Sequence, residues 1–238
     1  MPANSLTVVY NNLAADHRLA VDWGFACLVA AAGRRLLFDT GARGDLLLAN
    51  LKKLGIDPLT IDAVFLSHEH WDHTGGLAAL LAVNPRLTVI LPTTFSAPFR
   101  RTLARHRLTV ELVAAGGREL APGFFSTGPL GREVPEQALG VVAADRLVMV
   151  TGCAHPGVVE LGRQLLPVAG RPPTLVTGGF HLLAAPPPAV AAVSRGLEEL
   201  GVQFLAPSHC SGEAAIALLR RQWGTRLLPG GCGAVLPV

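Results

Sequence analysis

Short apolar runs alternate with loops and helix-like segments along most of this chain. The runs contain many β-branched residues and few polar interruptions, which is typical of strands covered on both faces. We predict strands at residues 7–10, 36–38, 63–66, 87–91, 147–150, 174–176 and 203–206. We predict helices at residues 45–54, 76–83, 157–166, 189–200 and 212–223. Gly55 and Gly201 are well placed to end two of these helices.

This alternation predicts an α/β fold with mixed sheets between layers of helices. A length of 238 residues suits one large domain or two fused half-size units with a shared core, and we expect residues 1–238 to form one domain. Two stretches are predicted to be connectors outside the core. Residues 115–137 are rich in glycine and proline and form either a lid or a seam between two halves, and residues 184–188 end in three prolines.

Composition narrows the class of protein. Half of the residues are apolar and 16% are charged, which allows a large core and argues against disorder. The formal net charge is only +3, so we expect no nucleic-acid partner. No apolar run reaches the roughly 18 residues of a membrane span, and residues 1–6 lack the pattern of a signal peptide. The four cysteines are scattered without a Cys-x-x-Cys pair, so we expect a reduced, cytoplasmic protein.

The histidines occupy related positions. Six of the eight follow predicted strands directly: His68, His70, His73, His155, His181 and His209. The carboxyl ends of neighbouring strands in layered α/β folds form one rim, where ligand sites gather. We therefore expect histidines from four separate loops to converge on one point. A lone histidine after a strand is more often a core or surface residue, and that reading stays open for His181.

The segment His68-Glu69-His70-Trp71-Asp72-His73 carries the strongest chemical signal. Imidazole and carboxylate groups are the ligands of zinc and similar ions, and catalytic sites keep one position open for water. His68 and His70 are close enough along the chain to reach one ion, and Asp72 and His73 face a second position. Zinc is the default for this ligand set, with manganese or iron as alternatives. We expect one or two divalent ions.

The same segment resembles the H-x-H-x-D-H signature of the metallo-β-lactamase superfamily. Asp39 matches an upstream aspartate that supports the metal-binding loop in that superfamily. The resemblance implies a four-layer αββα sandwich with the metal site along one edge. The stretches Thr151-Gly152-Cys153-Ala154-His155 and Gly178-Gly179-Phe180-His181 are similar to a narrower group, named after dihydropterin-ribofuranosylaminobenzene phosphate synthase.

The resemblance also implies roles for single residues. The first ion is expected to bind His68, His70 and His155, and the second is expected to bind Asp72, His73 and His209. Many relatives carry a bridging aspartate where this chain has Gly178-Gly179-Phe180-His181. His181 either replaces that ligand or serves as a substrate-contacting or proton-transfer residue. Cys153 and Cys210 are interpreted as loop-packing residues first, with a ligand role as the alternative.

We expect a metal-dependent hydrolase or related synthase that acts on a small anionic substrate, either phosphorylated or with another anionic group. Asp72 and His181 are the expected catalytic residues, the first as a ligand that orients water or accepts its proton and the second as general acid. Arg132 is the candidate substrate-binding residue, because a guanidinium fork suits phosphate or carboxylate. The arginines at 100, 101, 105 and 107 either line an anion pocket or form a solvated helix face. The alternatives are a lactonase or thioesterase on the same scaffold and a non-catalytic metal-binding protein, while the substrate and oligomeric state stay open.

Overall fold

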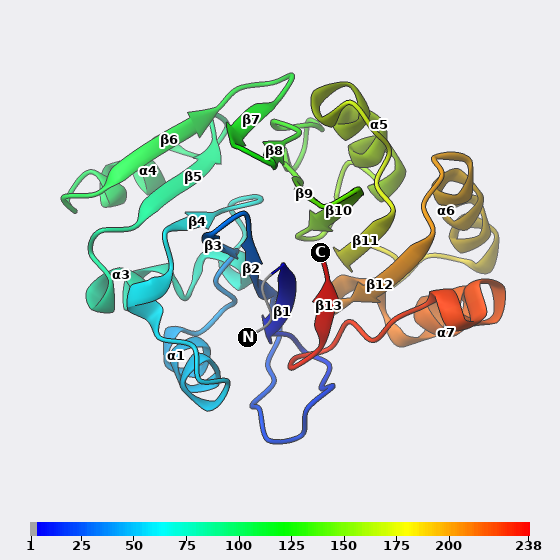
Figure 1. The fold of residues 1–238 in the computed structure, drawn as a ribbon, viewed down its shortest axis with the longest axis horizontal. Helices are drawn as coiled ribbons and strands as arrows, with labels where there is room; N and C mark the ends of the chain where they lie inside the picture. The colour runs from blue at the N-terminus through cyan, green and yellow to red at the C-terminus, as the bar shows by residue number, and fades with distance from the viewer. Residues whose placement is uncertain (1–3) are drawn as a thin grey trace.

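The computed structural model describes residues 4–238 and contains two mixed β-sheets that pack face to face (Figure 1). The first sheet has the order β13-β1-β2-β3-β4-β5-β6, and the second has the order β12-β11-β10-β9-β8-β7. The strands of the first sheet are β1 (Ser5–Tyr10), β2 (Ala26–Ala31), β3 (Arg34–Phe38), β4 (Ala63–Phe65), β5 (Thr88–Pro92), β6 (Thr109–Val113) and β13 (Val235–Pro237). Those of the second are β7 (Arg118–Ala121), β8 (Phe124–Ser126), β9 (Leu139–Ala143), β10 (Arg146–Thr151), β11 (Leu175–Gly179) and β12 (Phe204–Ser208).

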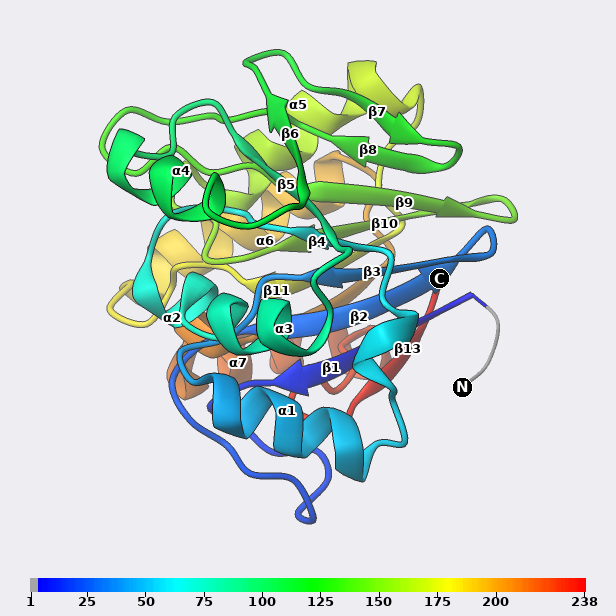
Figure 2. The same ribbon diagram turned by 90° about the vertical axis from the view of Figure 1, so that its left-hand side faces the viewer.

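Helices cover the outer face of each sheet, which completes four αββα layers (Figure 1). The first sheet is covered by α1 (Gly44–Lys53), α3 (Leu77–Val83) and α4 (Ala97–Leu103), and the second by α5 (Val158–Ala169), α6 (Pro187–Glu199) and α7 (Glu213–Trp223). A further short helix, α2 (Trp71–Thr74), lies at one end of the sandwich, opposite the end that holds the carboxyl terminus (Figure 2). The four-layer fold that the sequence predicts is confirmed.

The apolar runs are unbroken because each strand faces two cores. In β2, Cys27 and Val29 pack between the sheets, whereas Ala26 and Leu28 pack against the outer helices. Side chains of a strand alternate between its faces, so both sets of positions must be apolar when both faces are buried. A third core lies between the second sheet and α5, α6 and α7 and includes the buried Trp223.

All seven predicted strands and all five predicted helices are present, with ends shifted by a few residues. Gly55 and Gly201 follow the ends of α1 and α6 and adopt positive φ of 68° and 85°, so both predicted helix stops are confirmed. Within residues 4–238, six further strands lie outside the predicted runs: β2, β6, β7, β8, β9 and β13. No helix in the described part of the chain is long and apolar enough to cross a membrane.

The prediction that residues 115–137 lie outside the core is wrong. This segment contains β7 and β8, and Phe124 and Glu136 within it are buried. Its composition resembles that of a loop because tight turns at positive φ, such as Gly123, connect the short strands. The prediction that residues 184–188 form only a connector is also partly wrong, because α6 begins at Pro187. Proline is tolerated there because the first N–H groups of a helix have no partner within the helix.

Candidate metal centre

The six expected ligands lie together at one end of the sandwich. β4 leads into the loop that carries His68 and His70, and α2 follows with Asp72 and His73. In the second sheet, β10, β11 and β12 are parallel, and His155, His181 and His209 follow their carboxyl ends. The two sheets therefore bring distant parts of the chain to a common edge, as the sequence predicts.

The first cluster consists of His68, His70 and His155, whose facing ring nitrogens all lie within 4.8 Å of one another. His68 Nε2 is 3.1 Å from His70 Nδ1, and the ring of His155 lies 4.7 Å from that of His68 between centroids. His68 is fully buried, whereas His70 is exposed and His155 lies between these extremes. A cation held here would have a protein side and an open side, as a catalytic ion requires.

The second cluster consists of Asp72, His73, Cys153 and His209, and all four are buried. Asp72 Oδ2 lies 3.5 Å from His73 Nε2 and 3.3 Å from His209 Nε2. Although His209 Nε2 is buried, it has no hydrogen-bond partner. A buried nitrogen without a partner is costly, and a cation would satisfy it. The donor set of both clusters fits divalent zinc, manganese or iron.

Asp39 contacts ligands of both clusters, His73 directly and His68 through Ser67. Its carboxylate accepts hydrogen bonds from the backbone N–H of Ser67 at 2.8 Å and from the Ser67 hydroxyl at 2.7 Å. It also lies 2.7 Å from His73 Nδ1, while Ser67 Oγ lies 2.9 Å from His68 Nδ1. Contacts of this kind fix ring orientation and leave the opposite nitrogen free for a metal. Asp39 itself has a strained backbone with φ of 53°.

Glu136 plays the matching part in the second sheet, although the sequence analysis did not identify it. Its Oε1 accepts from the backbone N–H groups of Gly152, Cys153 and Ala154 at 3.1, 2.9 and 2.8 Å. Its Oε2 accepts from the N–H of His155 at 3.0 Å and lies 2.8 Å from His155 Nδ1. One fully buried carboxylate thus organises the whole loop after β10. A single glutamate in a proline-rich loop gives no sequence signal of this role.

Asn12 provides the equivalent contact for His209. Its Oδ1 lies 3.1 Å from His209 Nδ1, so that Nδ1 carries the ring proton and Nε2 faces the second cluster. The neighbouring Asn11 donates to Ser208 Oγ at 2.9 Å. The first strand of the chain therefore reaches the site through the loop that follows it.

The pKa values of His68 and His70 are lowered in the first cluster, and that of His73 is raised in the second. Burial, together with the neighbouring histidines, holds the pKa of His68 well below its ordinary value, and partial burial lowers the pKa of His70. Both rings are therefore neutral at neutral pH, as metal binding requires. Burial opposes a charge on His73, but the carboxylates of Asp39 and Asp72 outweigh it and raise its pKa to about 10. Without a cation, protonated His73 therefore supplies the positive charge that faces the carboxylates of Asp39 and Asp72.

The pKa values of the buried carboxylates also depend on burial, which raises them, and on neighbouring histidines and hydrogen bonds, which lower them. Burial opposes ionisation of Asp72, but His209 and His73 outweigh it and hold its pKa far below the ordinary range. Burial also opposes ionisation of Glu136, but His68 and the hydrogen bonds from His155 again lower its pKa strongly. For Asp39 burial prevails and raises the pKa. Because their pKa values are lowered, Asp72 and Glu136 are ionised at neutral pH.

His181 lies beside the first cluster but belongs to neither set of converging atoms. Its ring centroid is 4.7 Å from that of His155, and its side chain is exposed. A hydrogen bond with Cys210 raises its pKa. Its φ of 54° is strained for a residue with a side chain, as is the φ of 51° at His209. His181 therefore lies outside both groups of converging ligand atoms and lines a hollow beside the first cluster.

Arg132 lies at a hollow of about 290 Å³ next to the first cluster. The same hollow is lined by His155 and His181, so the predicted substrate-binding arginine and the predicted general acid face one space. The arginines at 100, 101, 105 and 107 are exposed on and after α4, as the solvated-face alternative expects.

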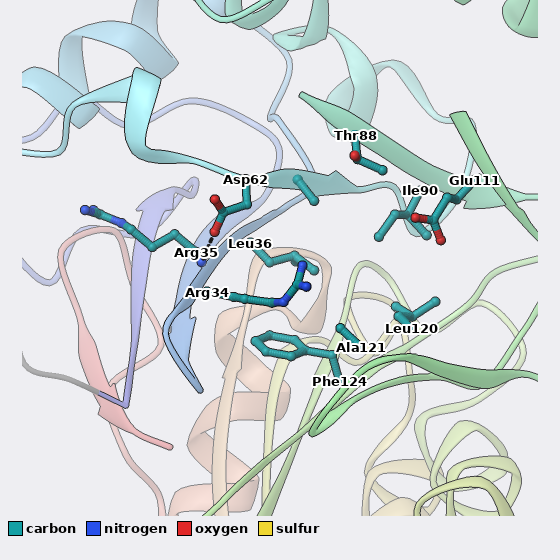
Figure 3. A pocket seen from close by; sticks show the side chains of 11 residues that line it. Arg34, Arg35, Leu36, Asp62, Thr88, Ile90, Glu111, Leu120, Ala121 and Phe124 are labelled. Carbon is teal, nitrogen blue, oxygen red and sulfur yellow. Dashed lines mark hydrogen bonds between the residues drawn. The ribbon is translucent and has the colours of Figure 1, made fainter. Parts of the chain in front are cut away.

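Another hollow, of about 70 Å³, lies between the sheets at the opposite ends of β3, β4 and β5 (Figure 3). Its walls include Arg34, Asp62 and Glu111 but none of the clustered histidines. The strands reach this end at their amino termini, far along each strand from the metal-binding loops. The hollow is therefore separate from the candidate metal centre.

Residues 24–161 match the metallo-beta-lactamase superfamily, and the chain belongs to it. Within the superfamily, the chain is similar to the 7,8-dihydropterin-6-methyl-4-(beta-D-ribofuranosyl)-aminobenzene-5'-phosphate synthase of Methanocaldococcus jannaschii. The two sequences are 30% identical over 224 residues, and the match covers 75% of this chain and 76% of that protein. The predicted superfamily and narrower group are both confirmed.

Solved structures agree with this assignment. Tm1679, a metal-dependent hydrolase of the beta-lactamase superfamily, is 28% identical with a TM-score of 0.79 over 99% of both chains. The short form of human tRNase Z shares the fold with 16% identity and a TM-score of 0.70, over 98% of this chain and 99% of that one.

Proposed function

We propose that this protein is a metal-dependent hydrolase, or a related synthase, that acts on a small anionic substrate bearing a phosphate group. The observation that carries the proposal is the convergence of His68, His70 and His155, within 4.8 Å, beside a hollow that contains Arg132. A divalent ion bound there supplies a water of lowered pKa and polarises a carbonyl or phosphoryl oxygen. Zinc is the first candidate, with manganese and iron as alternatives.

The residues of the chain divide the remaining work. His68, His70 and His155 would hold one ion, and Asp72, His73 and His209 would hold a second. Asp72 is buried between His73 and His209, so its carboxylate is fixed in place to orient a water or accept its proton. His181 is exposed at the rim of the hollow, where a general acid can protonate a leaving group.

The presence of Arg132 at the hollow is the reason that we propose an anionic substrate. Its guanidinium offers two parallel N–H donors, which match phosphate or carboxylate oxygens. The name of the Methanocaldococcus jannaschii relative contains a ribofuranosyl 5'-phosphate, and a phosphate of that kind suits an arginine beside the first cluster. We further propose that residues 1–238 form a single domain in the cytoplasm.

Metal analysis coupled to an activity screen tests the proposal. The purified protein should bind zinc, manganese or iron, and the loaded protein should turn over at least one substrate in a panel of phosphomonoesters, phosphodiesters, lactones, thioesters and a β-lactam. His70→Ala should lose the first ion and all turnover, whereas His106→Ala should retain both, because His106 is exposed and belongs to neither cluster nor to the lining of the adjacent hollow. A His70→Ala variant with full metal content would show that the ligand assignment is wrong.

The same panel separates the alternatives. Turnover confined to lactones or thioesters would replace the phosphorylated substrate with the lactonase or thioesterase alternative. Loss of turnover on every substrate by fully loaded protein would favour a non-catalytic metal-binding protein.

A further inference from the structure

We propose that the thiolate of Cys153 is the fourth ligand of the second cation, which it binds together with Asp72, His73 and His209. The inference rests on the metal-binding part of the proposed function and extends it to a ligand that takes the place of a bridging carboxylate. It changes the second site from an oxygen- and nitrogen-only set to one that contains sulfur, which favours zinc over manganese.

The distances within the cluster match the edges of a coordination polyhedron. Ligands at about 2.0–2.3 Å around a tetrahedral zinc ion lie roughly 3.3–3.8 Å from one another. Cys153 Sγ is 3.3 Å from His73 Nε2, and Asp72 Oδ2 is 3.5 Å from the same nitrogen. His209 Nε2 completes the set at 3.3 Å from Asp72 Oδ2. Three of the six edges therefore match those of a tetrahedral zinc site, and all four ligand atoms lie within 4.8 Å of one another.

The contacts of the Nδ1 atoms of His73 and His209 leave their Nε2 atoms facing the cluster. His73 Nδ1 is bound to the Asp39 carboxylate and His209 Nδ1 to the Asn12 side-chain oxygen, so both rings carry a proton on Nδ1. Their Nε2 atoms then meet a carboxylate and a sulfur, with His209 Nε2 buried and unpartnered. A cation between these four side chains would satisfy both the Asp72 carboxylate and the unpartnered His209 Nε2.

The structure leaves no room for a side chain at Gly179, which lies in the stretch where many relatives carry a bridging aspartate. A Cβ on Gly179 would lie 2.5 Å from Cys210 Sγ and 3.1 Å from the Cα of Cys153. The loop after β10 and the Cys210 side chain thus occupy the volume of a side chain at residue 179. A carboxylate at residue 179 would not fit, so a further ligand must come from another residue, and Cys153 is the one that converges with Asp72, His73 and His209.

The loop after β10 also explains how one segment serves both clusters. Glu136 gathers three successive N–H groups, and Ala154 adopts φ of 58° between Cys153 and His155. This turn sends His155 into the first cluster and Cys153 into the second. Before metal binds, a hydrogen bond with Cys210 raises the pKa of Cys153. On coordination the sulfur–metal bond forms and the thiol proton passes to solvent, because a coordinating thiol is deprotonated outright.

Cobalt substitution tests the ligand directly, by absorption rather than by activity. Metal-free protein titrated with Co²⁺ should develop a sulfur-to-cobalt charge-transfer band in the near ultraviolet. Cys153→Ser should lose that band, and its second-site affinity should fall by more than the roughly 10–100-fold that removal of an outer contact causes. Cys210→Ser is the matched control, since Cys210 is equally buried and its thiol contacts the carbonyl oxygen of Cys153 at 3.4 Å. It should keep the band.

The outcomes separate this inference from the proposed function. Failure to bind any Co²⁺ would overturn both. Binding without a charge-transfer band, or a band that Cys153→Ser retains, would overturn the thiolate ligand alone. Loss of the band in Cys210→Ser would assign the thiolate to Cys210 instead. If Cys153→Ser does not fold, a band in Cys210→Ser still identifies Cys153, because Cys27 packs between the sheets and Cys232 contacts Asn50.

Discussion

Replacement of Glu136 with glutamine is expected to weaken both the fold and the first metal cluster. Glu136 is fully buried and accepts hydrogen bonds from four successive backbone N–H groups, and it also lies 2.8 Å from His155 Nδ1. Glutamine has nearly the same shape but only one acceptor oxygen. If that oxygen keeps the three bonds at Oε1, the amide NH₂ group faces the N–H of His155, and two donors meet.

The magnitude follows from this exchange. The variant loses one charge-assisted hydrogen bond, worth about 1.5–3 kcal/mol, and converts three others to neutral bonds worth about 0.5–1.5 kcal/mol each. Burial of a neutral amide costs less than burial of a carboxylate, which offsets part of the loss. We expect the free energy of unfolding to fall by about 2–4 kcal/mol.

The metal site should change through the tautomer of His155. The amide of glutamine can donate to His155 Nδ1 only if the ring proton moves to Nε2, which removes the electron pair that would bind the ion. Affinity for the first ion should therefore fall by roughly 10–100-fold.

The pH dependence gives a second measure of the same contact. The pKa of Glu136 is lowered on folding, so its contribution to stability is present above the unfolded value of 4.5 and is lost as the pH falls below it. Between pH of about 5.5 and about 3.5, the wild type should lose about 1.4 kcal/mol more than Glu136→Gln.

Urea denaturation in the presence of chelator tests this prediction without a contribution from metal binding. Glu133→Gln is the matched control, because Glu133 is exposed in the same loop. The reasoning would be refuted if Glu136→Gln were within about 1 kcal/mol of the wild type, or if both proteins showed the same pH dependence.

Three further predictions concern other parts of the centre. Gly152→Ala should lower the free energy of unfolding by about 1–3 kcal/mol in urea titrations, because a Cβ would overlap Ser67 Oγ and lie 3.0 Å from Asp39 Oδ2; an unchanged midpoint would contradict this packing. Arg132→Ala should raise KM for a phosphate-bearing substrate by on the order of tenfold with little change in kcat, and Arg132→Lys should raise it less; equal KM values would remove Arg132 from the substrate site. Zinc affinity, measured by competition with a chromophoric chelator, should fall as the pH falls from about 8 to about 6, since the proton that His73 holds with its pKa of about 10 competes with the ion; a constant affinity would exclude His73 as a ligand.

The residues of the candidate metal centre could be found from the sequence because they follow strands that are themselves easy to recognise. Residues 63–66 and 147–150 are apolar on both faces, and the polar residues that follow them can only lie at a strand end. The parallel strands of each sheet then bring those ends to one edge. His68 and His155 are therefore predictable as neighbours although 87 positions separate them.

The segment between residues 115 and 137 could not be interpreted in the same way. Its strands are three or four residues long, and glycine turns dominate its composition, so no periodicity identifies β7 and β8. Glu136 shows the consequence most clearly. A glutamate next to Pro135 suggests an exposed loop, and only the packing of the second sheet buries it against four backbone N–H groups.

The order of apolar and polar residues by itself determined an α/β fold with mixed sheets and histidines that gather at one edge, because burial on two faces and the direction of parallel strands follow from that order. The resemblance to the metallo-β-lactamase superfamily added the four layers. Only the tertiary structure decided that Cys153 joins the second cluster while His155, two residues further along, joins the first. The assignment of His155 to one and Cys153 to the other depends on the strained turn at Ala154 and on the carboxylate of Glu136. Both result from contacts between segments distant in the chain, which local sequence patterns do not encode.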